Sequence, residues 1–240
     1  MEQNAAMSLV QLGIDFGLPL VALVIAYLAG AIPFGLLIGK VRGIDIRTMG
    51  SQNIGATNVF RCVGAKYGIL AFVLDMVKGV FGTLCGFLPA LLVADIPEDT
   101  TLLLRVLCGT SAMLGHMFPV YLKFKGGKGV STALGLLFGV APLAGLLGFA
   151  GWGIFFVSSR YVSLASCLAA CIVGGVMWSP LYADKPLWYA ILITLLALLA
   201  IVKHRQNIVR LCKGTENRFA FTAKQRAARD AKRAQQENAK

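Results

Sequence analysis

The chain has 240 residues, of which 57% are hydrophobic and only 14% charged, and its mean hydropathy is +0.73. So few charges cannot cover a water-facing globule of this size, which excludes an ordinary soluble domain and predicts an all-α integral membrane protein. The formal net charge of +12 could indicate a nucleic-acid partner, but no RNA- or DNA-binding motif accompanies it. Lys and Arg cluster in short stretches between apolar runs, so we interpret them as setting the orientation of the chain in a bilayer. Membrane lipids are therefore expected partners.

Six apolar runs predict the membrane-spanning part of the chain. In chain order they cover residues 18–39, 67–93, 102–122, 130–157, 162–177 and 187–202. The run 130–157 is 28 residues long and contains Ala141-Pro142. It could therefore form one long helix or a hairpin of two short ones.

The distribution of positive charge favours the hairpin over one long helix. The segment 40–66 and the segment from residue 203 onward are rich in Lys and Arg, so both should be cytoplasmic and an even number of spans should separate them. The hairpin satisfies this condition and gives seven transmembrane helices, two of them short, with the N-terminus outside and the C-terminus cytoplasmic. This topology places 20 of the 23 Lys and Arg residues on the cytoplasmic side. Because a full span needs ~20 residues, the two short helices should be tilted, re-entrant or covered by neighbours.

The predicted organisation is one polytopic domain, residues 1–219, followed by a basic polar cytoplasmic tail, residues 220–240. The six cysteines include no C-x-x-C pair, there are only two histidines, and the acidic residues are scattered. This pattern shows no metal-ligand cluster, so we expect neither a metal nor a cofactor.

A glycine-lysine loop, Lys125-Gly126-Gly127-Lys128-Gly129, separates two apolar runs. Glycines let the backbone approach a ligand, the lysines add positive charge, and the helix expected to begin here directs its N–H groups toward the loop. The loop therefore predicts an anion site, most naturally for phosphate. An ATP-binding P-loop is excluded because Gly129, not Ser or Thr, follows Lys128. The alternative interpretation is a flexible basic connection between spans.

Three other polar features accompany this loop. Residues 50–61 combine hydroxyl, amide and small side chains, which offer many hydrogen-bond donors but also suit any turn. At the end of the last run, His204 and Asn207 are one helical turn apart, and the histidine could be a catalytic base or an interfacial anchor. Within the second run, Asp75 and Lys78 share a helix face and could be a structural ion pair or an edge of the site.

Together these segments resemble the acyl-phosphate-dependent glycerol-3-phosphate acyltransferases of bacteria, the PlsY family. The likeness extends across about residues 27–219 and leaves out the N-terminal extension and the polar tail. The matching motifs are the G-S-x-N-x-G-A-T-N pattern from Gly50, Gly115-His116-Met117-Phe118-Pro119 leading into the glycine-lysine loop, His204-Arg205-x-Asn207, Ile32-Pro33-Phe34-Gly35, Leu74-Asp75-x-x-Lys78-Gly79, and Arg160-Tyr161-Val162-Ser163.

The resemblance implies transfer of the acyl group of acyl phosphate to the 1-hydroxyl of glycerol 3-phosphate. The products are lysophosphatidic acid and phosphate, and the reaction is the first acylation step of bacterial phospholipid synthesis. The resemblance also implies a multi-pass protein of the bacterial inner (plasma) membrane with its active site on the cytoplasmic side. The implied catalytic residues are Ser51, Lys128, His204 and Asn207, and the implied substrate-binding residues are Asn53, Thr57, Arg61, Lys125, Gly126, Gly127 and Gly129.

Charge suggests a role for several of these side chains. Arg61 and Lys128 can hold phosphate oxygens, and Ser51 and Asn53 can stabilise the oxyanion of a tetrahedral intermediate. Three proton routes stay open: Ser51 as nucleophile with His204 as base, His204 acting on the substrate hydroxyl, or a substrate phosphate accepting the proton. We expect the third route, because we can place no carboxylate of these segments beside the substrate hydroxyl.

The alternative function is that of an anion or phosphate carrier without catalysis. Carriers commonly show internal repeats and polar groups near the middle of the bilayer. The sequence shows no obvious repeat, and its polar residues collect at one interface apart from Asp75 and Lys78.

Overall fold

The computed structural model describes residues 16–93 and 95–220, and these residues form helices and connections without a strand. The all-α prediction is therefore confirmed for the described part of the chain. The helices are α2 (Leu18–Ala31), α3 (Phe34–Val41), α4 (Ala56–Cys62), α5 (Ala65–Cys85), α6 (Leu88–Leu92), α7 (Glu98–Met117), α8 (Val130–Val140), α9 (Pro142–Ser159), α10 (Val162–Met177), α11 (Leu187–Lys203) and α12 (Arg205–Cys212), with 3₁₀ turns η2 (Val120–Leu122) and η3 (Pro180–Tyr182).

Prolines and glycines interrupt the predicted apolar runs. The first run is broken at Pro33, which has no N–H to donate, so α2 ends at Ala31 and α3 continues at Phe34. The second run is likewise divided, with α5 ending at Cys85 before Gly86 and a short α6 following. The predicted break at Ala141 and Pro142 is confirmed, because α8 ends at Val140 and α9 begins at Pro142.

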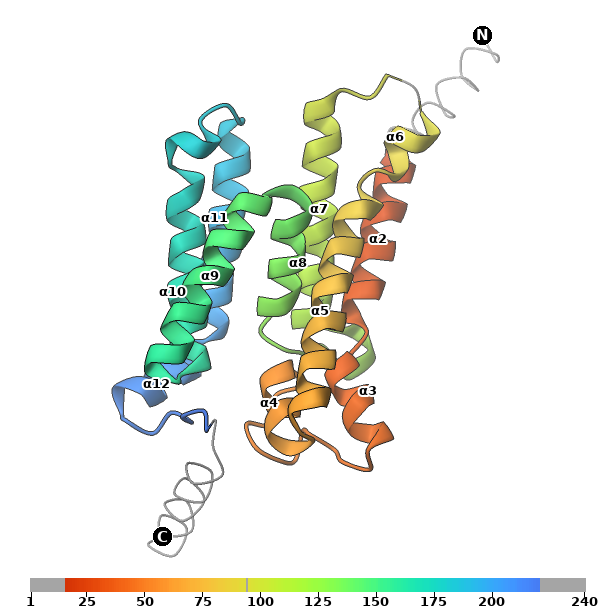
Figure 1. Cartoon of the computed structure of the whole chain (residues 1–240). Coiled ribbons are helices and arrows are strands. Elements are labelled where there is room, and N and C mark those ends of the chain that lie inside the picture. Colours follow the sequence, from red (N-terminus) through yellow and green to blue (C-terminus); the bar gives the residue numbers. More distant parts are fainter. Residues whose placement is uncertain (1–15, 94, 221–240) are drawn as a thin grey trace, which may run out of the picture.

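The helices form two groups with α8 and α9 as the link between them (Figure 1). In the first group α2, α5, α7 and α8 pack against one another, and in the second α10 packs against both α9 and α11. Helix α8 has 11 residues and is therefore about 16 Å long, which is too short for a hydrocarbon core of ~30 Å. It lies against α5, α7 and α9, which is one of the three arrangements expected for a short helix.

Close packing between the helices depends on small residues. A Cβ added at Gly82 in α5 would approach Ala112 Cβ of α7 to 2.6 Å, and one added at Gly135 in α8 would collide with the Met76 carbonyl of α5. These glycines therefore let α5 lie against α7 and α8 at short backbone separation.

Four helical segments are long and apolar enough to cross a membrane, and the bent pair α11 and α12 makes up to five. The four are Leu18–Val41, Ala65–Cys85, Glu98–Leu122 and Pro142–Ser159. Helices α8 and α10 are apolar but shorter.

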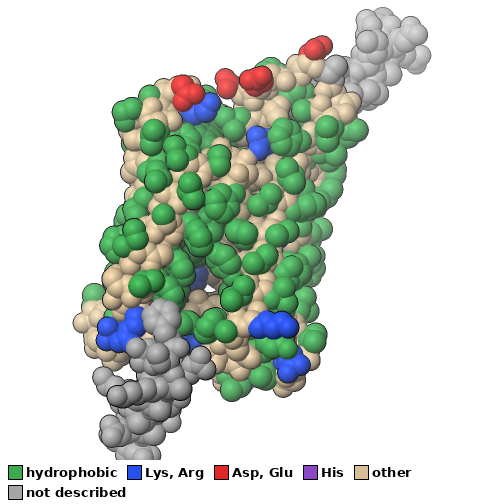
Figure 2. All heavy atoms as spheres, in the orientation of Figure 1, with side chains coloured by type: hydrophobic (Ala, Val, Ile, Leu, Met, Phe, Trp, Pro, Cys, Tyr) green, Lys and Arg blue, Asp and Glu red, His purple; other side chains and the backbone are tan. Residues whose placement is uncertain are grey.

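Charged side chains lie at the two ends of this apolar body. On the face shown in Figure 2, Asp and Glu lie at the upper end, and most Lys and Arg gather at the lower end. Figure 1 places α3, α4 and α12 at that lower end. The predicted tail, residues 220–240, lies outside the described residues except for Ala220.

Candidate active site

A cavity of about 260 Å³ lies between the two groups of helices. One end is polar, and the rest is lined mainly by apolar side chains of α8, α9, α10 and α11. The cavity brings together eight of the eleven predicted site residues, which come from three separate stretches of the chain. These eight are Ser51, Asn53, Thr57, Arg61, Lys128, Gly129, His204 and Asn207.

The loop before α4 is organised by a buried amide, Asn58, which is only 1% exposed. Its Oδ1 accepts the Ser51 backbone N–H at 2.8 Å, and its Nδ2 donates to the Ile46 carbonyl at 2.7 Å. Gly50 adopts a left-handed φ of 62° directly above Asn58, where a side chain would collide with the amide oxygen. Asn58 therefore fixes the backbone that presents Ser51 to the cavity.

Asn53 has a local structural role in the same loop. Its Oδ1 accepts the Gly55 N–H at 2.9 Å, just before α4 begins at Ala56. This leaves the Asn53 NH₂ group as the donor that can face a ligand. Thr57 and Arg61 lie on α4 and line the same end of the cavity.

Some residues of the glycine-lysine loop line the cavity and others do not. Lys128 and Gly129 line the cavity, and Gly129, with φ 80°, is the N-cap residue directly before α8. Lys125 is exposed and does not line the cavity. Gly126 and Gly127 pack against His116 instead, and the Gly127 N–H donates to the His116 carbonyl at 3.0 Å. The N–H of Gly127 is thus already engaged within the protein, and its predicted part in a phosphate cradle stays a prediction.

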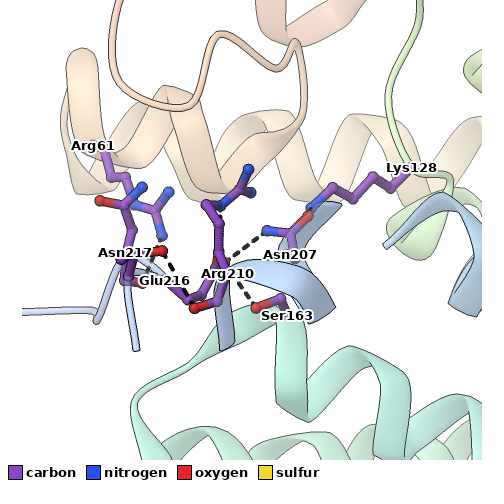
Figure 3. Close-up of polar contacts among 8 residues, drawn as sticks. Arg61, Lys128, Ser163, Asn207, Arg210, Glu216 and Asn217 are labelled. Carbon is purple, nitrogen blue, oxygen red and sulfur yellow. Dashed lines mark hydrogen bonds and ion pairs between the residues drawn. The ribbon is translucent and has the colours of Figure 1, made fainter. Parts of the chain in front are cut away.

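A polar network joins this loop to the end of the described chain (Figure 3). Lys128 Nζ donates to Asn207 Oδ1 at 2.5 Å, and Asn207 Nδ2 donates to Glu216 Oε1 at 2.6 Å. Ser163 Oγ donates to the same carboxylate oxygen at 2.8 Å, and Arg210 Nε donates to Glu216 Oε2 at 2.8 Å. We call Lys128, Ser163, Asn207, Arg210 and Glu216 the mouth network.

The segment after α12 borders this end of the cavity, which Glu216 lines. The Phe219 N–H donates to the Arg160 carbonyl at 2.8 Å, and the Phe219 ring lies 4.8 Å from that of Phe60. Arg61 donates to the Asn217 carbonyl at 3.4 Å (Figure 3). The segment therefore ties α4 to the turn between α9 and α10.

Burial and neighbouring charges shift the ionisation of two groups in the mouth network. The pKa of Lys128 is lowered to about 8, chiefly by burial; Glu216 opposes this shift, and the positive charges of Arg210 and Arg61 contribute to it. Burial by itself raises the pKa of Glu216, but hydrogen bonds from Asn207, Arg210 and Ser163 outweigh it and hold that pKa below its usual value. At neutral pH the network therefore contains a carboxylate and a largely protonated lysine that loses its charge near pH 8.

His204 lies between α11 and α12, where the chain bends by 55°, and is 3% exposed. Its Nδ1 is 2.8 Å from the Ala200 carbonyl. A carbonyl only accepts, so Nδ1 carries the proton that it donates, and Nε2 of the neutral ring is an acceptor. This geometry is compatible with a base, and it leaves the three proton routes open.

Asp75 and Lys78 form a buried ion pair with 2.8 Å between Asp75 Oδ1 and Lys78 Nζ. Lys78 Nζ also donates to the Ile32 carbonyl at 3.0 Å, and His116 Nδ1 lies 3.6 Å from Asp75 Oδ1. Asp75 and His116 also line the cavity. The sequence left two interpretations open, a structural ion pair or an edge of the site. They do not exclude each other, because this buried pair also borders the cavity.

Residues 20–214 match the family model described as Glycerol-3-phosphate acyltransferase. This match covers well over half of the chain. The chain belongs to the glycerol-3-phosphate acyltransferase family.

Relatives with this family name align along nearly their whole length. The glycerol-3-phosphate acyltransferase of Aquifex aeolicus is 45% identical over 197 residues, covering 82% of this chain and 96% of that protein. The one from Trichlorobacter lovleyi is 43% identical over 194 residues, covering 81% of this chain and 94% of that protein.

Two crystal structures of PlsY, an integral membrane glycerol 3-phosphate acyltransferase, resemble the fold. The glycerol 3-phosphate form is 41% identical with a TM-score of 0.71 and covers 84% of this chain and 96% of that chain. The lysophosphatidic acid form is 39% identical with a TM-score of 0.73 and covers 84% of this chain and 95% of that chain. The chain is therefore an integral membrane acyltransferase of phospholipid synthesis.

Some residues of this glycerol-3-phosphate acyltransferase site were missed by sequence reasoning. Ser163 was part of the matching Arg160–Ser163 motif but was assigned no role, and Asn58 ended the G-A-T-N pattern. Glu216 offered a weaker signal, because it is a lone carboxylate in a basic segment. The structure describes no group of three or more His, Cys, Asp or Glu residues suited to a metal between residues 16 and 220, residue 94 aside.

Proposed function

We propose that this acyltransferase takes its acyl group from acyl phosphate and transfers it to the 1-hydroxyl of glycerol 3-phosphate. The products are lysophosphatidic acid and inorganic phosphate. The observation that supports this proposal is a single cavity with a cationic, donor-rich end and an apolar interior. Such a cavity suits two phosphate groups and one hydrocarbon chain. The crystal forms of PlsY with glycerol 3-phosphate and lysophosphatidic acid add support.

The transfer is an attack of the 1-hydroxyl oxygen on the acyl carbonyl carbon. A C–O bond forms to glycerol 3-phosphate, and the bond between the acyl carbon and the phosphate oxygen breaks. In this proposal Lys128 and Arg61 hold phosphate oxygens, while Ser51 and the Asn53 NH₂ group donate to the oxyanion. Thr57, Asn207 and the loop from Lys125 to Gly129 bind and orient the substrates.

The proton of the attacking hydroxyl passes to a substrate phosphate in this proposal. The carboxylate of the mouth network is a poor alternative base, because Glu216 already accepts hydrogen bonds from Asn207, Ser163 and Arg210. The phosphate released from acyl phosphate leaves as an anion that can take this proton, so the atoms and charges balance without a covalent enzyme intermediate.

We further propose seven spans in a bacterial inner membrane, with the mouth network on the cytoplasmic side. The concentration of Lys and Arg at the end that holds α4 and α12 supports this orientation. A Thr215→Cys variant in a thiol-free background tests it, because Thr215 is exposed at that end. A membrane-impermeant maleimide should label this cysteine only after the cells are opened. Labelling in intact cells would contradict the topology.

The donor is tested with purified protein in detergent. Glycerol 3-phosphate is supplied together with acyl phosphate, acyl-CoA or an acyl carrier protein thioester, and lysophosphatidic acid and phosphate are both measured. We expect one phosphate per lysophosphatidic acid with acyl phosphate and no product with either thioester. Product formation from a thioester alone would overturn the proposed donor, and absence of turnover with every donor would favour the carrier alternative.

A further inference from the structure

The apolar part of the cavity meets the protein core at side chains of α8, α10 and α11. Leu137 of α8, Val173 of α10 and Ile193 of α11 line the cavity and are 8%, 6% and 1% exposed. All three also belong to a core cluster that contains Met177 and Tyr189, which do not line the cavity. The core of the protein therefore begins directly behind these three side chains, so this end of the cavity is closed.

Hydrogen bonds fasten the closed end to the turn between α8 and α9. Tyr189 Oη donates to the Val140 carbonyl at 2.5 Å, and Tyr182 Oη accepts the Ala144 N–H at 3.1 Å. These bonds join α11 and η3 to the two helices of the hairpin. These hydrogen bonds therefore fix the position of the closed end relative to the turn between α8 and α9.

The distance from the polar end to the closed end matches one leaflet of a membrane. On α11, His204 and Ile193 both line the cavity eleven positions apart, which is ~16 Å at the helical rise of 1.5 Å per residue. On α10, Ser163 and Val173 are ten positions apart, or ~15 Å. The hydrocarbon core of a bilayer is ~30 Å thick, so each leaflet's chains fill about half of it.

We propose that Val173 and Ile193 set the longest acyl chain that the enzyme accepts at full rate. This inference rests on the proposed function, in which the acyl carbonyl lies at the polar end and the chain enters the apolar interior. A chain that reaches Val173 and Ile193 has filled the cavity, and each further methylene must displace buried core. Chains longer than the cavity therefore lose binding in the transition state, and shorter chains leave apolar surface uncontacted.

The test moves the closed end in both directions and measures kcat/KM with decanoyl, palmitoyl and stearoyl phosphate. Val173→Phe shortens the cavity and should lower the stearoyl-to-decanoyl ratio of kcat/KM by about tenfold or more, since a single methylene in an apolar pocket is worth at least that factor. Ile193→Ala lengthens the cavity and should raise the same ratio. Leu195→Phe is the matched control, because Leu195 is on the same helix but 54% exposed.

The expected result is opposite shifts for the two variants, no shift for Leu195→Phe, and an unchanged KM for glycerol 3-phosphate in all three. Should Val173→Phe fail to fold, Ile193→Ala decides the outcome alone. Equal losses for every chain length, or a ratio identical to that of the wild type, would overturn the inference. If the wild type turns over none of the acyl phosphates, the proposed donor itself fails, which is a different result.

Discussion

Two polar clusters border the same cavity, and they are built in different ways. The mouth network joins residues from the glycine-lysine loop, α10, α12 and the segment after α12. Its Arg210 side chain is 37% exposed, while the Glu216 side chain is 5% exposed and Ser163 and Asn207 are buried. The Asp75–Lys78 pair comes from one turn of α5, and the Lys78 side chain is only 4% exposed.

This difference indicates what each cluster can do. An ion pair without access to water is costly to break, because separation leaves an uncompensated charge in a low-dielectric interior. Lys128 and Arg210 are only partly buried, so these two cations can exchange an internal acceptor for a substrate phosphate at smaller cost. We therefore expect mutations of the buried pair to act on folding and mutations at the polar end to act on catalysis.

The largest effect is expected for Asp75→Asn, which leaves the Lys78 ammonium without its counter-charge. We expect the free energy of unfolding to fall by ~3–5 kcal/mol, measured by thermal unfolding in detergent. The double variant Asp75→Asn, Lys78→Met removes both charges and should recover part of this loss. If the double variant is no more stable than the single one, the pair does not act as a buried ion pair.

Ser51→Ala tests the polar end of the cavity, where we expect mutations to act on catalysis. Ser51 is exposed and its backbone is held by Asn58, so the variant should keep wild-type stability. As an oxyanion donor, its hydroxyl should contribute ~10²–10³-fold to kcat, and Ser51→Thr should keep part of that rate. Mass spectrometry of the wild type after incubation with acyl phosphate alone should show no adduct. A stoichiometric acyl group on Ser51 would replace direct transfer with a nucleophilic mechanism.

Gly127→Ala probes the residue that lies between the two clusters. Its new methyl group meets the His116 ring, and His116 in turn lies beside Asp75. The collision should displace the glycine-lysine loop and lower kcat/KM for glycerol 3-phosphate, by up to ~10²-fold for a shift of about 1 Å. Initial-rate kinetics with each substrate varied in turn provide the measurement. A rise in KM for acyl phosphate alone would mean that the loop binds the other phosphate.

The smallest effect concerns the charge of Lys128. Its pKa is lowered to about 8, so the ammonium is present below that pH and is lost as the pH rises through it. We expect kcat/KM for glycerol 3-phosphate to decline above about pH 8 in the wild type. Lys128→Arg stays protonated at these pH values and should show no such decline, whatever its absolute rate. Identical alkaline limbs for the two proteins would assign the titration to another group.

The membrane class, the helical content and the break at Ala141 and Pro142 were predicted from the sequence, because composition, apolar runs and proline act over short distances along the chain. Motif resemblance also identified Ser51, Lys128, His204 and Asn207, all of which line the cavity. In contrast, the breaks at Pro33 and Gly86 were not predicted, since each lies within a run that was interpreted as one continuous span.

The tertiary structure alone decided which polar groups meet. Lys128 and Asn207 are 79 positions apart, and Ser163 and Glu216 are 53 apart. It also directed Gly126 and Gly127 toward His116, and it placed Val173 and Ile193 both in the cavity lining and in the core cluster. Periodicity shows that a helix forms and which residues are apolar, but helix pairing depends on side-chain shape across the whole bundle. Contacts between distant segments follow from that packing.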